Sequence, residues 1–93
     1  MDKMVYAASK VADYDKRITT LTPQLTNIGI DTDQVINDVN WGKVDSYNSA
    51  VATIIEMMDK KKISSDEATK LGEALSAVKE LTVRRGAFLE EYD

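Results

Sequence analysis

Apolar residues recur at three- and four-residue steps along most of the chain, which is the spacing of one face of an α-helix. The clearest run covers residues 65–92. Ser64 and Glu67 have the spacing of a capping box immediately before and inside its first turn. Leu71 and Leu75 then continue the apolar face. The pattern therefore predicts a long helix that starts at Ser64.

A second run occupies residues 45–62 and carries a heptad-like series of apolar positions, Val44, Tyr47, Val51, Ile54 and Met58. Asp45 or Ser46 is expected to cap the start of this helix, because Asp and Ser are common N-cap residues. Only two or three residues separate this run from the next helix, and short connections join antiparallel neighbours. Residues 45–62 and 65–92 are therefore predicted to form an antiparallel helical hairpin.

The first third of the chain keeps a three-four apolar spacing from Met4 to Ile28, but Pro23 interrupts it. An interior proline removes a backbone hydrogen bond and disfavours helix at the preceding residue. We expect a helix from about Lys3 to Thr20 and then a kinked or short second piece that ends before Gly29. The direction of this N-terminal helix relative to the hairpin stays open.

A short helix is expected after the turn at residues 29–33, with Asp31 or Thr32 as its cap and Val35 and Val39 on its apolar face. Gly42 is expected to end this helix or to bend it into the next. The predicted fold is all-α: a small three-helix bundle, built on the hairpin with a kinked N-terminal helix, in a single domain of residues 1–93.

Composition narrows the range of functions. The 93 residues include no histidine and no cysteine, and 12 basic against 16 acidic residues give a net charge of -4. Without these two residue types there are no disulfides, no thiolate or imidazole metal sites and no His-dependent catalytic triads. We expect no enzyme activity, no cofactor and no metal. An acidic surface repels phosphate backbones, which argues against nucleic-acid binding.

No apolar stretch approaches the roughly 20 residues that span a membrane, and residues 1–4 lack the pattern of a signal peptide. A cytoplasmic location is expected, with secretion by a route that needs no classical signal peptide left open.

Arg84 and Arg85 are the first candidate site. In a hairpin that turns at residues 63–64, antiparallel register sets them beside Trp41 and Asp45. A guanidinium over the indole or an ion pair with the aspartate would be structural. Free arginines beside Trp41 would instead suit a small anionic ligand.

The leading functional hypothesis is a non-catalytic, acidic helical protein that binds a partner protein, as an adaptor, an inhibitor or a phage or bacterial accessory protein does. Three heptad-like stripes exceed what a monomeric core of this size must bury, so one stripe is expected to face another chain. The expected surface combines the N-terminal seam with the end of the last helix: Met4, Val11, Ile18, Phe88, Leu89 and Tyr92. Closure of an intramolecular bundle by the same residues is the alternative.

Two other functions stay open. The first is a homo-oligomer in which Tyr14, Lys16 or Arg17 of one chain and Arg84 or Arg85 of another hold a small anion such as a nucleotide. The second follows from a resemblance: length, absence of cysteine and the central Trp41-Gly42 are similar to the WXG100 proteins of type VII secretion. That resemblance implies a secreted hairpin of two long helices. The sequence departs from it because glycine directly follows Trp41 and Pro23 interrupts the first helix.

Overall fold

The structure, a computed structural model, describes the backbone of residues 3–92 and the side chains of residues 6 and 8–90. It is all-helical over this range, with 83% of residues in helix. The four helices are α1 (Lys3–Thr26), α2 (Thr32–Asn40), α3 (Asp45–Asp59) and α4 (Ser65–Tyr92). The predicted small helical bundle is confirmed, with the short α2 added to three longer helices.

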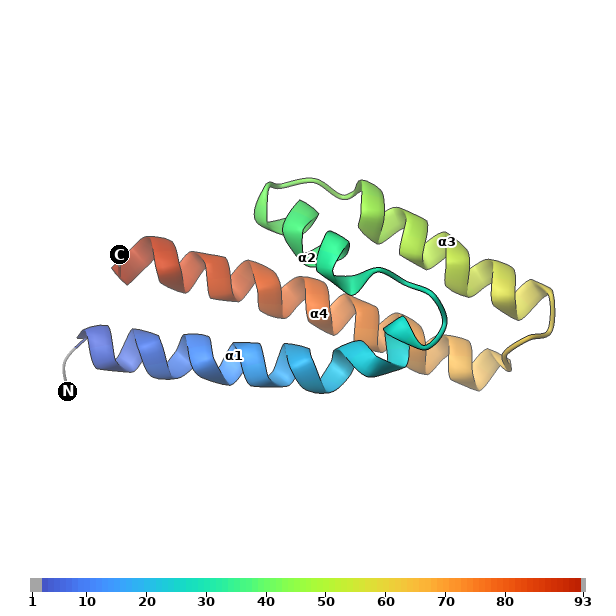
Figure 1. Cartoon of the computed structure of the whole chain (residues 1–93), viewed down its shortest axis with the longest axis horizontal. Coiled ribbons are helices and arrows are strands. Elements are labelled where there is room, and N and C mark those ends of the chain that lie inside the picture. Colours follow the sequence, from blue (N-terminus) through green and yellow to red (C-terminus); the bar gives the residue numbers. More distant parts are fainter. Residues whose placement is uncertain (1–2, 93) are drawn as a thin grey trace.

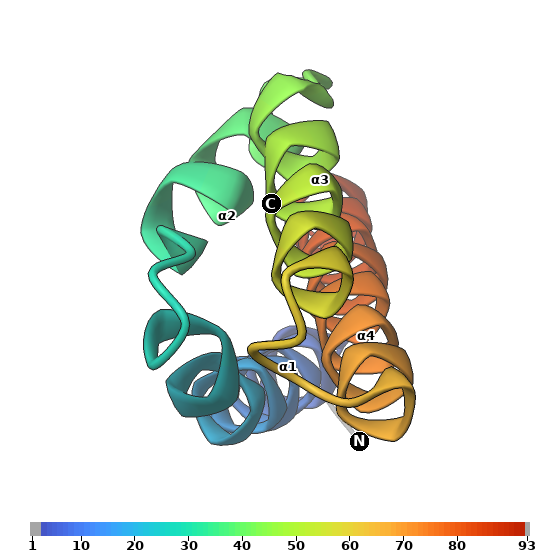
Figure 2. The same ribbon diagram turned by 90° about the vertical axis from the view of Figure 1, so that its right-hand side faces the viewer.

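Helix α4 is the centre of the bundle, because it packs against each of the other three helices and most extensively against α1 (Figure 1). α1 and α4 run side by side in opposite directions along the longest dimension of the molecule, 51 Å. α3 and α4 form the predicted antiparallel hairpin. Viewed along the long axis, α2 and α3 lie together on one side of the α1–α4 pair (Figure 2).

The predicted starts of α4 and α2 are confirmed by their caps. The Glu67 amide donates to Ser64 Oγ at 3.1 Å, and the Ser64 amide donates to the Glu67 carboxylate at 3.4 Å, which completes the capping box. At α2 the cap is Asp31, whose carboxylate accepts from the Gln34 amide at 3.1 Å. Gly42, with φ of +72°, ends α2 in the left-handed conformation that glycine adopts without a steric penalty.

The start of α3 differs from the prediction, because neither Asp45 nor Ser46 caps it. Val44 occupies the cap position and makes no side-chain hydrogen bond to the helix. The pKa of Asp38 in α2 is lowered chiefly by the Ser46 hydroxyl, and also by Gln34, the Ser46 backbone amide and the Lys43 charge. Asp38 therefore adds a negative charge to that of Asp45 near the first turn of α3. The Ser46 hydroxyl also donates to the Gln34 carbonyl at 3.4 Å, which links the two helices.

The question of continuity at Pro23 is answered, since α1 runs as one helix through Pro23 to Thr26 and ends before Gly29 as expected. Proline has no amide to donate to the Thr19 carbonyl, and the Thr22 hydroxyl donates to that carbonyl instead, at 3.2 Å. The helix ends three residues after Pro23, so the ring disturbs only the last turn. Two further bonds, from the Ile28 and Ile30 amides to the Leu25 carbonyl at 3.2 and 3.1 Å, close the helix end ahead of α2.

α3 ends at Asp59 rather than at residue 62. Lys61 follows with φ of +58°, the one positive φ found outside glycine in the described part of the chain. Its amide donates to the Met58 carbonyl at 3.0 Å, and the Lys62 amide reaches back to Met57 at 2.9 Å. This is a helix-terminating motif whose left-handed position usually holds glycine.

The core lies between α4 and the faces that the other helices turn toward it. Its buried apolar members are Ile18, Leu25, Ile30, Val35, Ala50, Ile54, Leu71, Ala74, Leu75, Val78 and Leu81. The three-four stripes of the sequence supply these residues, so each stripe faces the interior along part of its length.

Candidate functional site

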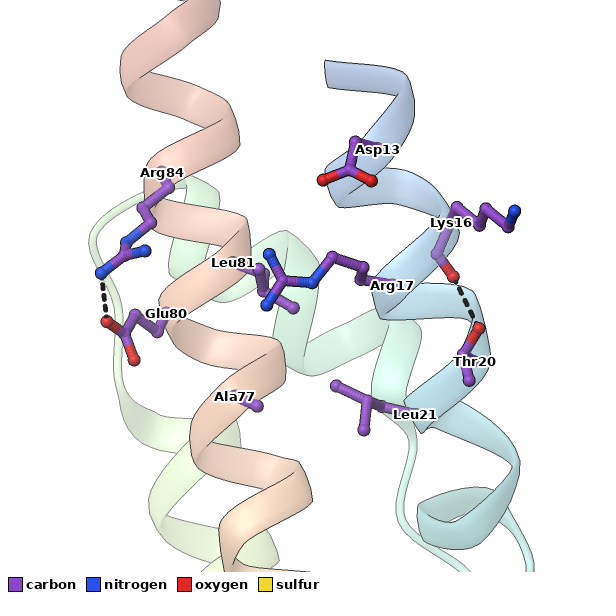
Figure 3. A pocket seen from close by; sticks show the side chains of 9 residues that line it. All are labelled: Asp13, Lys16, Arg17, Thr20, Leu21, Ala77, Glu80, Leu81 and Arg84. Carbon is purple, nitrogen blue, oxygen red and sulfur yellow. Dashed lines mark hydrogen bonds and ion pairs between the residues drawn. The ribbon is translucent and has the colours of Figure 1, made fainter. Parts of the chain in front are cut away.

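A groove of about 530 Å³ runs between α1 and α4, on a face that neither α2 nor α3 lines (Figure 3). A space of this size is in the range of ligand and peptide sites. Five residues of α1 and four of α4 line it: Asp13, Lys16, Arg17, Thr20, Leu21, Ala77, Glu80, Leu81 and Arg84. The antiparallel packing of the two helices brings these residues together from opposite ends of the chain.

The floor of the groove is apolar. Leu21 and Ala77 are half-buried, and Leu81 is 5% exposed. Leu81 belongs to the core and Leu21 packs against it, so the floor lies at the edge of the core. The groove therefore leaves part of the Leu21 and Ala77 side chains uncovered.

Charged residues surround this floor. The Arg17 side chain extends from α1 across the groove toward α4, while Asp13, one turn earlier on α1, also faces the groove (Figure 3). Among the hydrogen bonds and ion pairs of the described residues, none involves the side chain of Arg17 or of Asp13. Lys16 lies on the outer edge and points away. Within the described part of the chain, Arg17 and Asp13 are therefore an unpaired cation and an unpaired anion on the same helix that face the floor, and Lys16 is a second unpaired cation on the rim.

Arg84 is paired within its own helix. Its Nη2 lies 2.7 Å from Glu80 Oε1, and the two side chains are 58% and 62% exposed. An exposed i,i+4 pair contributes only a few tenths of a kcal/mol, about 0.3 to 0.5. Arg84 can therefore exchange partners at little cost, but in this structure its charge is balanced.

Arg85 points instead to the opposite side of the α1–α4 contact. Its Nε donates to Asp15 Oδ1 at 2.5 Å, with side-chain exposures of 32% and 52%. It lines a second cavity of about 340 Å³ that includes Ile36 and Asn40 of α2. Arg85 thus ties α4 to α1 next to α2 and does not reach the groove.

The predicted contact of Arg84 or Arg85 with Trp41 or Asp45 is not formed. Trp41 is 76% exposed in the turn between α2 and α3. The hairpin does bring Lys79 over the Tyr47 ring, 4.5 Å from its centroid. The α3–α4 register does not extend to residues before 45, because the chain leaves the direction of α3 at Gly42. Arg84 and Arg85 therefore lie beside α1 and α2 and not beside Trp41.

The predicted partner surface is also corrected in part. Ile18 is 7% exposed and belongs to the core, and Val11 is half-buried. Phe88 is half-buried against two rings of α1, 6.1 Å from Tyr6 and 5.8 Å from Tyr14 between centroids. Leu89 is 45% exposed, while the side chains of Met4 and Tyr92 lie outside the described residues. The N-terminal seam therefore closes the intramolecular bundle over most of its described length.

Lys16, Arg17 and Arg84, which the oligomer hypothesis assigned to two chains, line one groove of one chain. Sequence reasoning missed the role of Asp13, Leu21, Ala77 and Glu80. Asp13 with Arg17 and Glu80 with Arg84 each place an acid four residues before a base, which is a recognisable signal of a solvent-facing helix strip. Their convergence depended on the direction of α1, which the sequence leaves open.

The described residues form neither a metal site nor a membrane-spanning helix. No group of three or more acidic side chains, the only candidate ligands here, is placed to hold a metal ion. None of the described helices combines the length and apolarity required to cross a membrane. No protein-family profile, curated protein or solved structure matches this chain.

The Trp41-Gly42 turn joins helices of nine and 15 residues, whereas the WXG100 resemblance implied a turn between two long helices. The two longest helices, α1 and α4, are separated by the whole of α2 and α3. The long-hairpin expectation is therefore wrong.

Proposed function

We propose that this chain is a non-catalytic protein that acts by binding another polypeptide, and that the groove between α1 and α4 is the binding surface. The observation that carries the proposal is the combination of a partly uncovered apolar floor with an unpaired cation and an unpaired anion above it. Two antiparallel helices offer a third helix a complementary seam, because ridges of side chains pack into grooves of this kind. The cytoplasm stays the predicted compartment.

The absence of histidine and cysteine from the sequence supports a binding function over a catalytic one. General acid–base catalysis would need Asp, Glu, Lys or Tyr with a strongly perturbed pKa in an enclosed site. The groove is instead open to solvent, and its acidic residues, Asp13 and Glu80, are both exposed.

A small anionic ligand is the second candidate, because Lys16, Arg17 and Arg84 line the same groove. Two features disfavour it. Arg84 is already paired with Glu80, and Asp13 faces the groove beside Arg17. A free anion such as a nucleotide would meet nearly balanced charge. A polypeptide surface that carries both signs suits the groove better.

Photo-crosslinking tests the proposal. A benzoylphenylalanine at Thr20, which is exposed on the groove rim, should give a covalent adduct whose mass and peptide fragments identify a polypeptide. The same group at Asn48, exposed on α3, is the control, because α3 does not line the groove. If Thr20 gives no more polypeptide adduct than Asn48, the groove is not a protein-binding surface.

A further inference from the structure

We infer that the occupant of the α1–α4 groove is the same face of a second copy of this chain, with Asp13 of each copy paired to Arg17 of the other. This inference rests on the proposed function and names the partner for that site. It follows from three observations on the groove: the two unpaired charges, their spacing along α1, and the exposed strip that continues beyond them.

The first observation is charge. Asp13 and Arg17 have an i,i+4 spacing that would allow them to pair within the helix. In the structure the Arg17 side chain extends across the groove instead, and the described residues give neither side chain an ion-pair partner. An occupant that satisfies both must present a cation to Asp13 and an anion to Arg17.

The second observation is symmetry. In a two-fold contact the same patch meets itself, so each residue and its partner exchange roles. If two α1 helices cross in opposite directions at the level of residue 15, Asp13 of each lies opposite Arg17 of the other. Packed helices are about 8 to 10 Å apart, which a guanidinium can span to reach a carboxylate. The same face therefore carries both of the charges that a symmetric contact between two copies needs.

The third observation is an exposed aromatic side chain, Tyr6, placed to cover the apolar floor of the groove in a second copy. Tyr6 lies one heptad before Asp13 on the same strip of α1 and is 40% exposed. In the antiparallel arrangement Tyr6 of one copy faces residue 24 of the other, next to the partly uncovered Leu21. The ring would cover apolar surface there. Because α1 and α4 lie side by side over most of the molecule's length, the contact can extend past the charged residues (Figure 1).

Other occupants fit less well. A uniformly acidic helix would satisfy Arg17 but would meet Asp13 and Glu80, and a basic helix would meet Arg17 and Arg84. A foreign partner needs the matching pattern of both signs, whereas a second copy necessarily has it.

Charge reversal with mixing tests the inference. Sedimentation equilibrium should show that the wild-type chain dimerises, and that D13R and R17D each raise the dimer dissociation constant at least about tenfold, because like charges then face each other. An equimolar mixture of D13R and R17D should form a heterodimer close to wild-type affinity, since both cross-copy pairs are again opposite in sign. Lys62→Asp, a reversal from positive to negative charge like R17D but at an exposed position outside the groove, should dimerise normally.

A monomeric wild-type chain overturns the inference, and so do single variants that dimerise normally or a mixture that fails to rescue. The Thr20 adduct then decides whether a different polypeptide occupies the groove, so the two proposals fail separately. Since the chain has no cysteine, Thr20→Cys with a spin label gives a check that leaves the charged residues unchanged. Electron–electron resonance should find a distance between copies of about 15 to 25 Å. If no distance in that range is found, the proposed arrangement of the two copies is contradicted. This result does not depend on whether the charge variants fold.

Discussion

At the residue scale, Lys61 carries a conformational cost that the sequence conceals. Its φ of +58° places it in the left-handed region, where a side chain with a Cβ costs roughly 1 to 2 kcal/mol relative to the right-handed conformation. Glycine has no such cost, although it loses more backbone freedom on folding. We expect Lys61→Gly to raise the free energy of unfolding by up to about 1 kcal/mol.

Urea denaturation measures this effect. Lys61→Ala is the matched control, because it removes the same lysine side chain but keeps the Cβ that makes the conformation unfavourable. The control should show no gain. Equal effects of the two substitutions would assign any change to the side chain and not to the backbone.

Asp38 gives a second residue-scale prediction, on pH. The Ser46 hydroxyl is the largest cause that lowers the pKa of Asp38 below its ordinary value of 3.8. A depressed folded-state pKa contributes stability that is present above the unfolded pKa and is lost as pH falls through the folded pKa. An NMR titration should therefore find the Asp38 carboxyl titrating below pH 3.8.

Ser46→Ala should move the pKa of Asp38 back toward 3.8 and flatten the acid side of the stability profile. The carboxyl of Glu56, whose pKa is lowered chiefly by Lys60, is the internal reference and should not respond to the substitution. An unchanged Asp38 pKa in Ser46→Ala would mean that Ser46 does not hold that carboxylate.

At the scale of the element, the ends of α1 and α3 show where sequence signals fall short. The capping box of α4 and the Asp31 cap of α2 could be predicted because the cap and its partner lie three residues apart in the sequence. Whether α1 continues through Pro23 could not be predicted, because the Thr22 side chain takes over the role of the missing amide. The α3 cap prediction failed because Val44 takes the cap position and the Ser46 hydroxyl donates to the Gln34 carbonyl of α2. A local pattern cannot reveal a partner that the tertiary fold supplies.

A double-mutant cycle tests the account of Pro23. Thr22→Val should lower the free energy of unfolding by about 0.5 to 1.5 kcal/mol, because the Thr19 carbonyl loses its donor. In a Pro23→Ala background the new amide serves that carbonyl, so Thr22→Val should cost less. Thr19→Val removes a hydroxyl bond to the Asp15 carbonyl, which a backbone amide already serves, and should not couple to Pro23. Additive effects of Thr22→Val and Pro23→Ala would contradict the compensation.

At the scale of the whole molecule, the sequence predicted the helical content and the α3–α4 hairpin but not the dominant packing of α1 on α4. Apolar stripes give helix faces, whereas helix direction depends on the path of α2 through space. For the same reason Ile18 was expected on a partner surface and lies in the core. The groove residues Asp13, Arg17 and Glu80 were visible as charged positions, but only the antiparallel packing of α1 and α4 brings them together.

The central claim is that the α1–α4 groove is the face by which this chain meets another chain, and that the other chain is a second copy. Backbone amide chemical shifts of the wild-type protein, measured over a hundredfold dilution, test it most directly. The account predicts concentration-dependent shifts at residues 13–21 and 77–84 and none at residues 41–58. Shifts centred on the exposed Trp41 turn, or no shifts at any concentration, would contradict it.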